Sequence, residues 1–170
     1  MTKAVFTTKV DPVYDDLPEN RYHFPQTYLR QVQAALGDWI VYYEPRRSSE
    51  NLSSRGGRQC YFAVAKLINI EPDPSTPKHY YAFVDQYLEF DRAVPFREGE
   101  ITYEKGLTKD DGSTNKGLFG RSVRHLSDSE FDLILMSGYS RTIGEEKSIL
   151  PISREDQSNY AGFRDCLRTH

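Results

Sequence analysis

The chain has 170 residues, of which 38% are hydrophobic and 28% charged, and its formal net charge is -3 at pH 7. This length suits one well-buried domain, and no run approaches the roughly 18 apolar residues of a membrane span. The N-terminal segment turns acidic and lacks the apolar centre of a signal peptide, so we expect a cytoplasmic protein with no membrane contact. Two cysteines are too few for a disulfide framework and make no metal-ligand spacing.

The first part of the chain shows strand and helix patterns in turn. Ala4 to Lys9 is rich in β-branched and aromatic residues and predicts a strand. Pro25 to Leu36 has apolar residues at helical spacing and a proline at the first helical position, and Gly37 suits the residue that closes a helix. Trp39 to Tyr43 then predicts a buried strand.

Two long strands are expected after a polar loop at Arg46 to Gly57. Gln59 to Ile70 is apolar on both faces for most of its length, which is typical of a central barrel strand. A turn rich in proline leads into a second strand, Tyr80 to Phe90, and the two should pair antiparallel. Val94 to Phe96 predicts a short edge strand, because its proline cannot donate a backbone hydrogen bond.

The remaining sequence contains one more clear helix. Glu98 to Gly120 has low hydrophobicity, and we expect it to be poorly ordered without a partner. The letters SDSE at Ser127 to Glu130 form a capping box before an apolar run that Gly138 closes. Beyond this helix the chain is mostly polar, and Tyr160 to Leu167 is either a short helix, a tail or the beginning of a further segment.

No set of catalytic or metal-binding residues can be assembled from the sequence. None of the four histidines lies near another histidine or a cysteine at metal-ligand spacing. The best nuclease-like trace combines Pro72-Asp73 with Glu145-Glu146-Lys147, but these lie far apart, and the second half has no strand character. We therefore expect no catalytic residue, no metal and no cofactor.

Aromatic residues and arginines are concentrated in the middle of the chain. Alternation along three consecutive strands directs some aromatic side chains to the core and others to a surface or pocket that stacks on flat rings. The pocket candidates are Trp39, Tyr43, Tyr61, Tyr80 and Tyr81. The cations of two loops form either solvated surface or one basic face that contacts nucleic-acid phosphates. The candidates for that contact are Arg46, Arg47, Arg58, Gln59, Lys116, Arg121 and Arg124.

The order of these segments resembles a known family. GDWIVYYEP, AVAKLINIEPDP and HYYAFVDQYLEFDRAVPF are similar to EVE-type domains of the PUA-like superfamily, whose relatives include SRA, YTH and ASCH domains. Gly37-Asp38, Pro72-Asp73 and Val84-Asp85 stand at the matching places. AVFTTK, RYHFPQTYL and RSVRHLSDSEF resemble the N-terminal region of bacterial endonucleases that carry an HNH nuclease domain farther on, although the HNH histidines and asparagine are absent here.

This resemblance implies an α+β fold, a strongly bent and mostly antiparallel PUA-like β-barrel with flanking helices. Residues 1–140 would be the recognition domain, and 141–170 a polar extension or a linker toward a nuclease domain. The implied function is a binding module of a restriction system, not an enzyme, which recognises a modified base in DNA.

The resemblance further implies how the base is read. A modified cytosine would be flipped into an aromatic pocket, between the strand Trp39 to Tyr43 and the strand starting at His79. Two alternatives remain, an RNA-binding PUA-like protein and a domain that binds a nucleoside or another small molecule.

Overall fold

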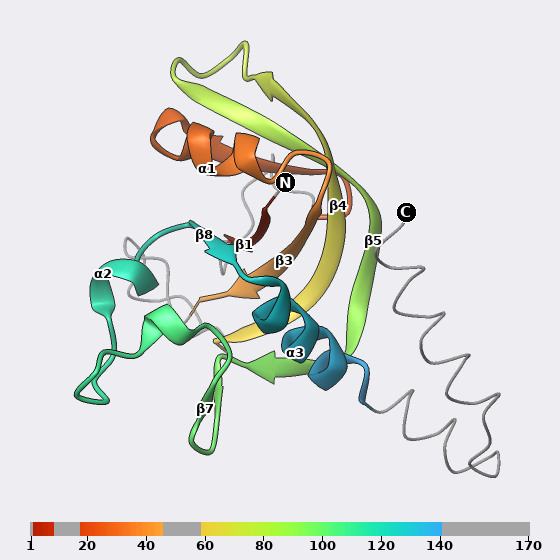
Figure 1. The fold of residues 1–170 in the computed structure, drawn as a ribbon. Helices are drawn as coiled ribbons and strands as arrows, with labels where there is room; N and C mark the ends of the chain where they lie inside the picture. Colours follow the sequence, from red (N-terminus) through yellow and green to blue (C-terminus); the bar gives the residue numbers. More distant parts are fainter. Residues whose placement is uncertain (1, 9–17, 46–58, 141–170) are drawn as a thin grey trace, which may run out of the picture.

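A six-stranded sheet curls into a half-barrel in the computed structural model, which describes residues 2–8, 18–45 and 59–140 (Figure 1). The strand order is β2-β5-β4-β3-β1-β8. These strands are β1 (Lys3–Thr7), β2 (Arg21–Pro25), β3 (Trp39–Glu44), β4 (Cys60–Pro72), β5 (His79–Pro95) and β8 (Val123–Leu126). A small hairpin joins β6 (Arg97–Glu98) to β7 (Ile101–Thr102).

Short helices flank the sheet. The helical elements are η1 (Gln26–Tyr28), α1 (Leu29–Ala34), η2 (Lys105–Leu107), α2 (Lys116–Phe119) and α3 (Asp128–Gly138). In Figure 1, α1 lies across one end of the curled sheet, α3 packs near the other end, and α2 stands apart from the sheet. None of the helices within the described residues is long and apolar enough to cross a membrane.

The pairing of the strands is mostly antiparallel. β4 pairs antiparallel with β5 along nearly its whole length, as predicted, and several register shifts mark where the two strands bend. β1 is the exception, because it runs parallel to β3 on one side and antiparallel to β8 on the other. The expected α+β fold, a bent and mostly antiparallel barrel with flanking helices, is therefore confirmed.

Each face of the sheet carries its own core. One cluster fills the face covered by α1 and includes Phe6, Phe24 and Leu67. The other lies under α3 and joins Trp39 and Tyr61 to the buried side chains of that helix. Alternation along β1 and β3 explains this division, since successive residues point to opposite faces and both faces are covered.

Two element boundaries differ from the prediction. The predicted helix at 25–36 begins later, because residues 21–25 form β2, which pairs with β5 and buries Tyr22 and Phe24. β2 is an edge strand of the sheet, a position that tolerates Pro25. Val94 to Phe96 is not a separate edge strand either: Val94 and Pro95 continue β5 and pair with β4.

The expectation of poor order at Glu98 to Gly120 is wrong. This segment forms the β6–β7 hairpin, η2 and α2, and it buries Tyr103, Glu104 and Leu107 against the rest of the domain. The capping box of α3, by contrast, is confirmed: Ser127 accepts from the Glu130 backbone, and the Glu130 side chain accepts from the Ser127 backbone.

Candidate nucleic-acid interface

An open groove lies where the chain leaves β3, enters β4 and later returns through α2. Its volume is about 670 Å³, within the range of ligand pockets. The lining residues are Pro45, Gln59, Phe96, Thr114, Lys116, Phe119 and Gly120. Two of the predicted phosphate-contacting residues, Gln59 and Lys116, therefore lie in one groove although they are far apart in sequence.

Two phenylalanines form the aromatic wall of the groove. Phe96 and Phe119 meet edge to face with their ring centroids 4.9 Å apart, and both are partly exposed. Behind them, the ring centroid of Tyr43 lies 6.0 Å from that of Phe119 and 5.2 Å from that of Tyr61. The wall is thus the outer end of an aromatic stack that begins in the core, which limits how far the two rings can move.

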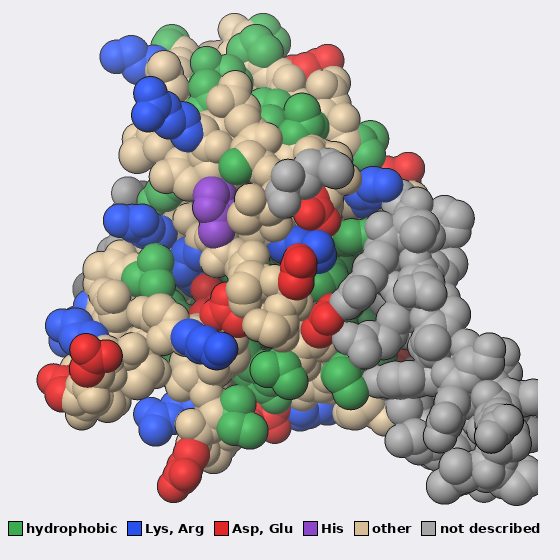
Figure 2. Space-filling model, in the orientation of Figure 1, with side chains coloured by type: hydrophobic (Ala, Val, Ile, Leu, Met, Phe, Trp, Pro, Cys, Tyr) green, Lys and Arg blue, Asp and Glu red, His purple; other side chains and the backbone are tan. Residues whose placement is uncertain are grey.

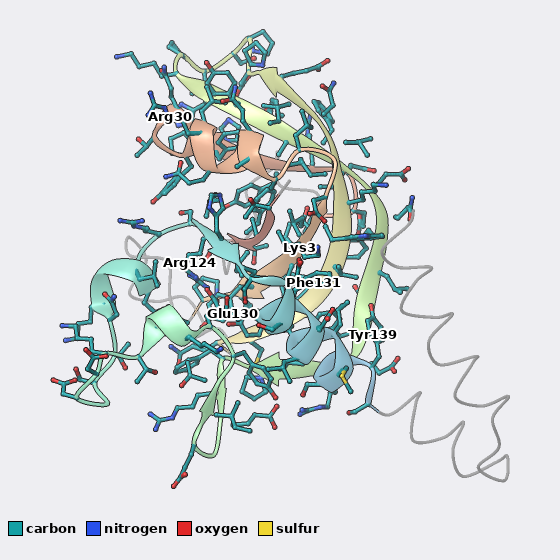
Figure 3. The ribbon with its side chains drawn as sticks, in the orientation of Figure 1. Lys3, Arg30, Arg124, Glu130, Phe131 and Tyr139 are labelled. Atoms are coloured by element: carbon teal, nitrogen blue, oxygen red, sulfur yellow. The ribbon has the colours of Figure 1, made fainter. Side chains whose placement is uncertain are left out.

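A buried ion pair ties the C-terminal end of α2 to β8. Nε and Nη2 of Arg124 donate to the two carboxylate oxygens of Glu104, each at 2.8 Å, and Tyr61 donates to the same carboxylate at 2.6 Å. Nη1 of Arg124 donates to the carbonyl oxygens of Phe119 at 3.4 Å and Arg121 at 3.2 Å. This guanidinium therefore fixes the backbone on which the groove residues of α2 sit, and Figure 3 shows it below β8.

Burial and the charge of Glu104 shift the pKa of Arg124 in opposite directions and the pKa values of the two tyrosines in the same direction. Burial alone lowers the pKa of Arg124, but the hydrogen bonds and charge of Glu104 outweigh it, so the net pKa is raised. Burial also raises the pKa of Tyr43 and of Tyr61, and Glu104 adds to both effects. Arg124 consequently stays charged at neutral pH, and the hydroxyls of Tyr43 and Tyr61 stay protonated.

The structure does not bring the five predicted pocket aromatics together. Trp39, Tyr43 and Tyr61 are buried in the core under α3. Tyr80 and Tyr81 lie at the far end of β5, where Tyr80 packs on Phe24 and Tyr81 on His23. β4 lies between β3 and β5 in the sheet, so the strand Trp39 to Tyr43 does not lie next to the start of β5, where the pocket was expected.

The predicted phosphate contacts have different fates. Arg46, Arg47 and Arg58 lie outside the described residues. Arg124 is buried, with 2% of its surface exposed, and its guanidinium is occupied by Glu104. Gln59 and Lys116 line the groove. Arg121 is exposed and comes directly after Gly120, which also lines the groove.

Phe96 and Phe119 were not predicted from the sequence as site residues. Both stand in stretches interpreted as a strand end and a loop, and neither has tyrosine neighbours that mark an aromatic cluster. One sequence signal was available for Phe119. Asn115 is a good N-cap residue, and in the structure its side chain accepts from the Leu118 backbone and starts the short helix that carries Phe119.

The described residues hold no group of three or more His, Cys, Asp or Glu side chains placed to bind a metal ion. Glu104, the buried carboxylate near the groove, is engaged in the pair with Arg124. The groove offers instead flat apolar rings, an ammonium group and an amide, which together suit a flat ring joined to an anion.

Comparison with known proteins places the fold. No protein-family model matches the chain, and no curated protein does. Among solved structures, it is similar to the N-terminal domain of Staphylothermus marinus McrB, with a TM-score of 0.50 and 10% sequence identity over 79% of this chain and 93% of that one. At this identity the likeness concerns the fold, and the fold is PUA-like.

Proposed function

We propose that this chain is a nucleic-acid-binding module of a restriction system, which holds DNA at the groove between Gln59, Lys116 and the two phenylalanines. The PUA-like fold supports the class of ligand. The observation that carries the proposal is the meeting of Gln59 and Lys116, from separate parts of the chain, beside two partly exposed aromatic rings.

The finer part of the proposal concerns the base. A modified cytosine flipped out of the duplex would stack against Phe96 or Phe119, while Lys116 neutralises a neighbouring phosphate. Extruding a base costs a few kcal/mol, and stacking on an aromatic side chain contributes about 1 to 3 kcal/mol. We thus assign the stacking role to the partly exposed Phe96 and Phe119 instead of Tyr43 and Tyr61, which are buried in the core.

Binding of labelled oligonucleotides tests this proposal. Duplexes carrying 5-methylcytosine, 5-hydroxymethylcytosine, N6-methyladenine or no modification are compared with RNA and free nucleosides by fluorescence anisotropy. Lys116→Ala should weaken duplex binding and reduce its salt dependence, whereas Lys66→Ala, a partly exposed lysine on β4 outside the groove, should leave both unchanged.

The aromatic wall has its own test. Phe96→Ala should reduce selectivity for a modified duplex over an unmodified one, because the stacking surface is removed. Equal affinity of the wild-type protein for modified and unmodified duplexes would overturn the base-reading part, and tighter binding to RNA would favour the RNA alternative. Nucleoside binding without salt dependence would favour the small-molecule alternative.

A further inference from the structure

A row of exposed cations continues from the groove across β8 to α1. Arg121 follows the groove residue Gly120 and precedes β8, and Arg30 lies on α1. Figure 2 shows Lys and Arg side chains along the edge of the molecule that Figure 1 assigns to α1, β8 and α2. Figure 3 shows Arg30 on α1, with its side chain directed outward.

A contact between elements fixes α1 beside β8. Nε2 of His125, an exposed residue of β8, donates to the backbone carbonyl of Gln31 at 3.1 Å. Gln31 is the neighbour of Arg30, so this hydrogen bond places the Arg30 segment directly next to β8. The row from Lys116 through Arg121 to Arg30 therefore rests on elements that are tied to each other.

Unlike Lys3, Arg92 and Arg124, the three cations of this row are not engaged by an acidic side chain among the residues that the structure describes. Lys3 pairs with Asp38 and Asp128, and Arg92 pairs with Glu98. Arg30, Lys116 and Arg121 are exposed and form no ion pair with any residue that the structure describes. On a chain with a net charge of -3, unpaired cations that share one edge create a local positive surface.

We propose that this row, Lys116, Arg121 and Arg30, is a track for the phosphate backbone of the nucleic acid whose base enters the groove. The proposal rests on the proposed function and adds α1 to the interface, which the sequence alone did not indicate. Arg30 and Arg121 would contact phosphates that flank the groove, and β8 would lie beneath the strand. Such contacts are independent of base sequence and position the duplex.

The salt dependence of duplex binding tests the track. The slope of log affinity against log salt is negative, and removing one cation that touches a phosphate should make it shallower by roughly 0.7 to 0.9. Arg30→Ala should show this decrease, Arg30→Lys should retain the wild-type slope because the charge stays, and the double variant Arg30→Ala, Arg121→Ala should show about twice the decrease. Lys66→Ala is the matched control. Melting temperatures should stay at the wild-type value, since these side chains are exposed.

The outcomes separate this inference from the proposed function. If the wild-type protein binds no nucleic acid, both fail. If Lys116→Ala flattens the slope but Arg30→Ala behaves like Lys66→Ala, the track is overturned while the groove stands. If an acidic peptide binds as tightly as the duplex and competes with it, the row is a surface for acidic proteins, and its assignment to nucleic acid is overturned.

Discussion

Arg124 and Glu104, 20 residues apart in the sequence, form a two-pronged ion pair in the interior, with 1% and 4% of their side-chain surfaces exposed. One partner belongs to β8 and the other to the segment that follows the β6–β7 hairpin. The pair thus attaches this segment to the sheet, in addition to the burial of Tyr103 and Leu107.

Breaking this pair should be costly. Glu104→Gln leaves the Arg124 charge buried without a counter-charge, and such changes cost about 3 to 5 kcal/mol. Glu98→Gln is the matched control, because Glu98 pairs with Arg92 at a site where both side chains are about a third or more exposed. It should cost about 1 kcal/mol or less. Urea unfolding of both variants measures the difference, and equal destabilisation would contradict the structural role of the buried pair.

Tyr43 and Tyr61 are a second matched pair. Both hydroxyls are buried, but that of Tyr61 donates to Glu104, whereas that of Tyr43 has no hydrogen-bond partner in the described structure. Tyr61→Phe should cost about 1.5 to 3 kcal/mol, because it removes a hydrogen bond to a charged group. Tyr43→Phe should be neutral or stabilising, since it removes an unsatisfied polar group. A destabilised Tyr43→Phe variant would show that this hydroxyl has a partner in solution.

Gly138 tests the packing of α3. A Cβ at this position would lie 2.6 Å from the ring of Phe90, which is itself packed against Tyr139. Gly138→Ala should therefore destabilise the protein, because the overpacking cost of about 1 to 3 kcal/mol exceeds the gain of about 1 kcal/mol in helix propensity. Gly117→Ala in α2 is the control, because its nearest neighbour would be 3.6 Å away. If thermal melting shows Gly138→Ala to be as stable as Gly117→Ala, the close contact is absent.

Acid stability should depend on Asp73. A hydrogen bond from the Ser75 backbone lowers the pKa of this carboxyl, with further contributions from Thr76 and from His23 at 3.0 Å. A lowered folded-state pKa stabilises the fold above the unfolded pKa, and this stabilisation is lost as the pH falls below about 4. In Asp73→Asn, the unfolding free energy should therefore fall less steeply as the pH is lowered below about 4. Glu98, whose pKa Arg92 lowers, should maintain a residual slope.

The sequence predicted well those elements whose signals are local. Runs of apolar and aromatic residues identified β3, β4 and β5, and the SDSE letters located the start of α3 to the residue. The bent α+β barrel was implied by the family resemblance. Each of these features depends on residues that are close together in the chain.

The features that could not be predicted depend on contacts between distant residues. β2 is a strand because β5 lies beside it, although Pro25, its last residue, also fits a helix start. The 98–120 segment is held by the ion pair between Arg124 and Glu104. The residues next to each partner in the sequence do not predict this pairing. Alternation predicted that some aromatic residues of β3 and β4 face a surface, but Trp39, Tyr43 and Tyr61 all lie in the core under α3.

The position of β1 in the sheet has a consequence for how the protein folds. The first strand of the chain lies between β3 and β8, so one of its edges stays open until residues 123–126 have joined the sheet. Long-range pairing of this kind slows folding, and an open edge invites pairing with other chains. During synthesis, this edge of β1 therefore stays unpaired until more than half of the chain has emerged from the ribosome.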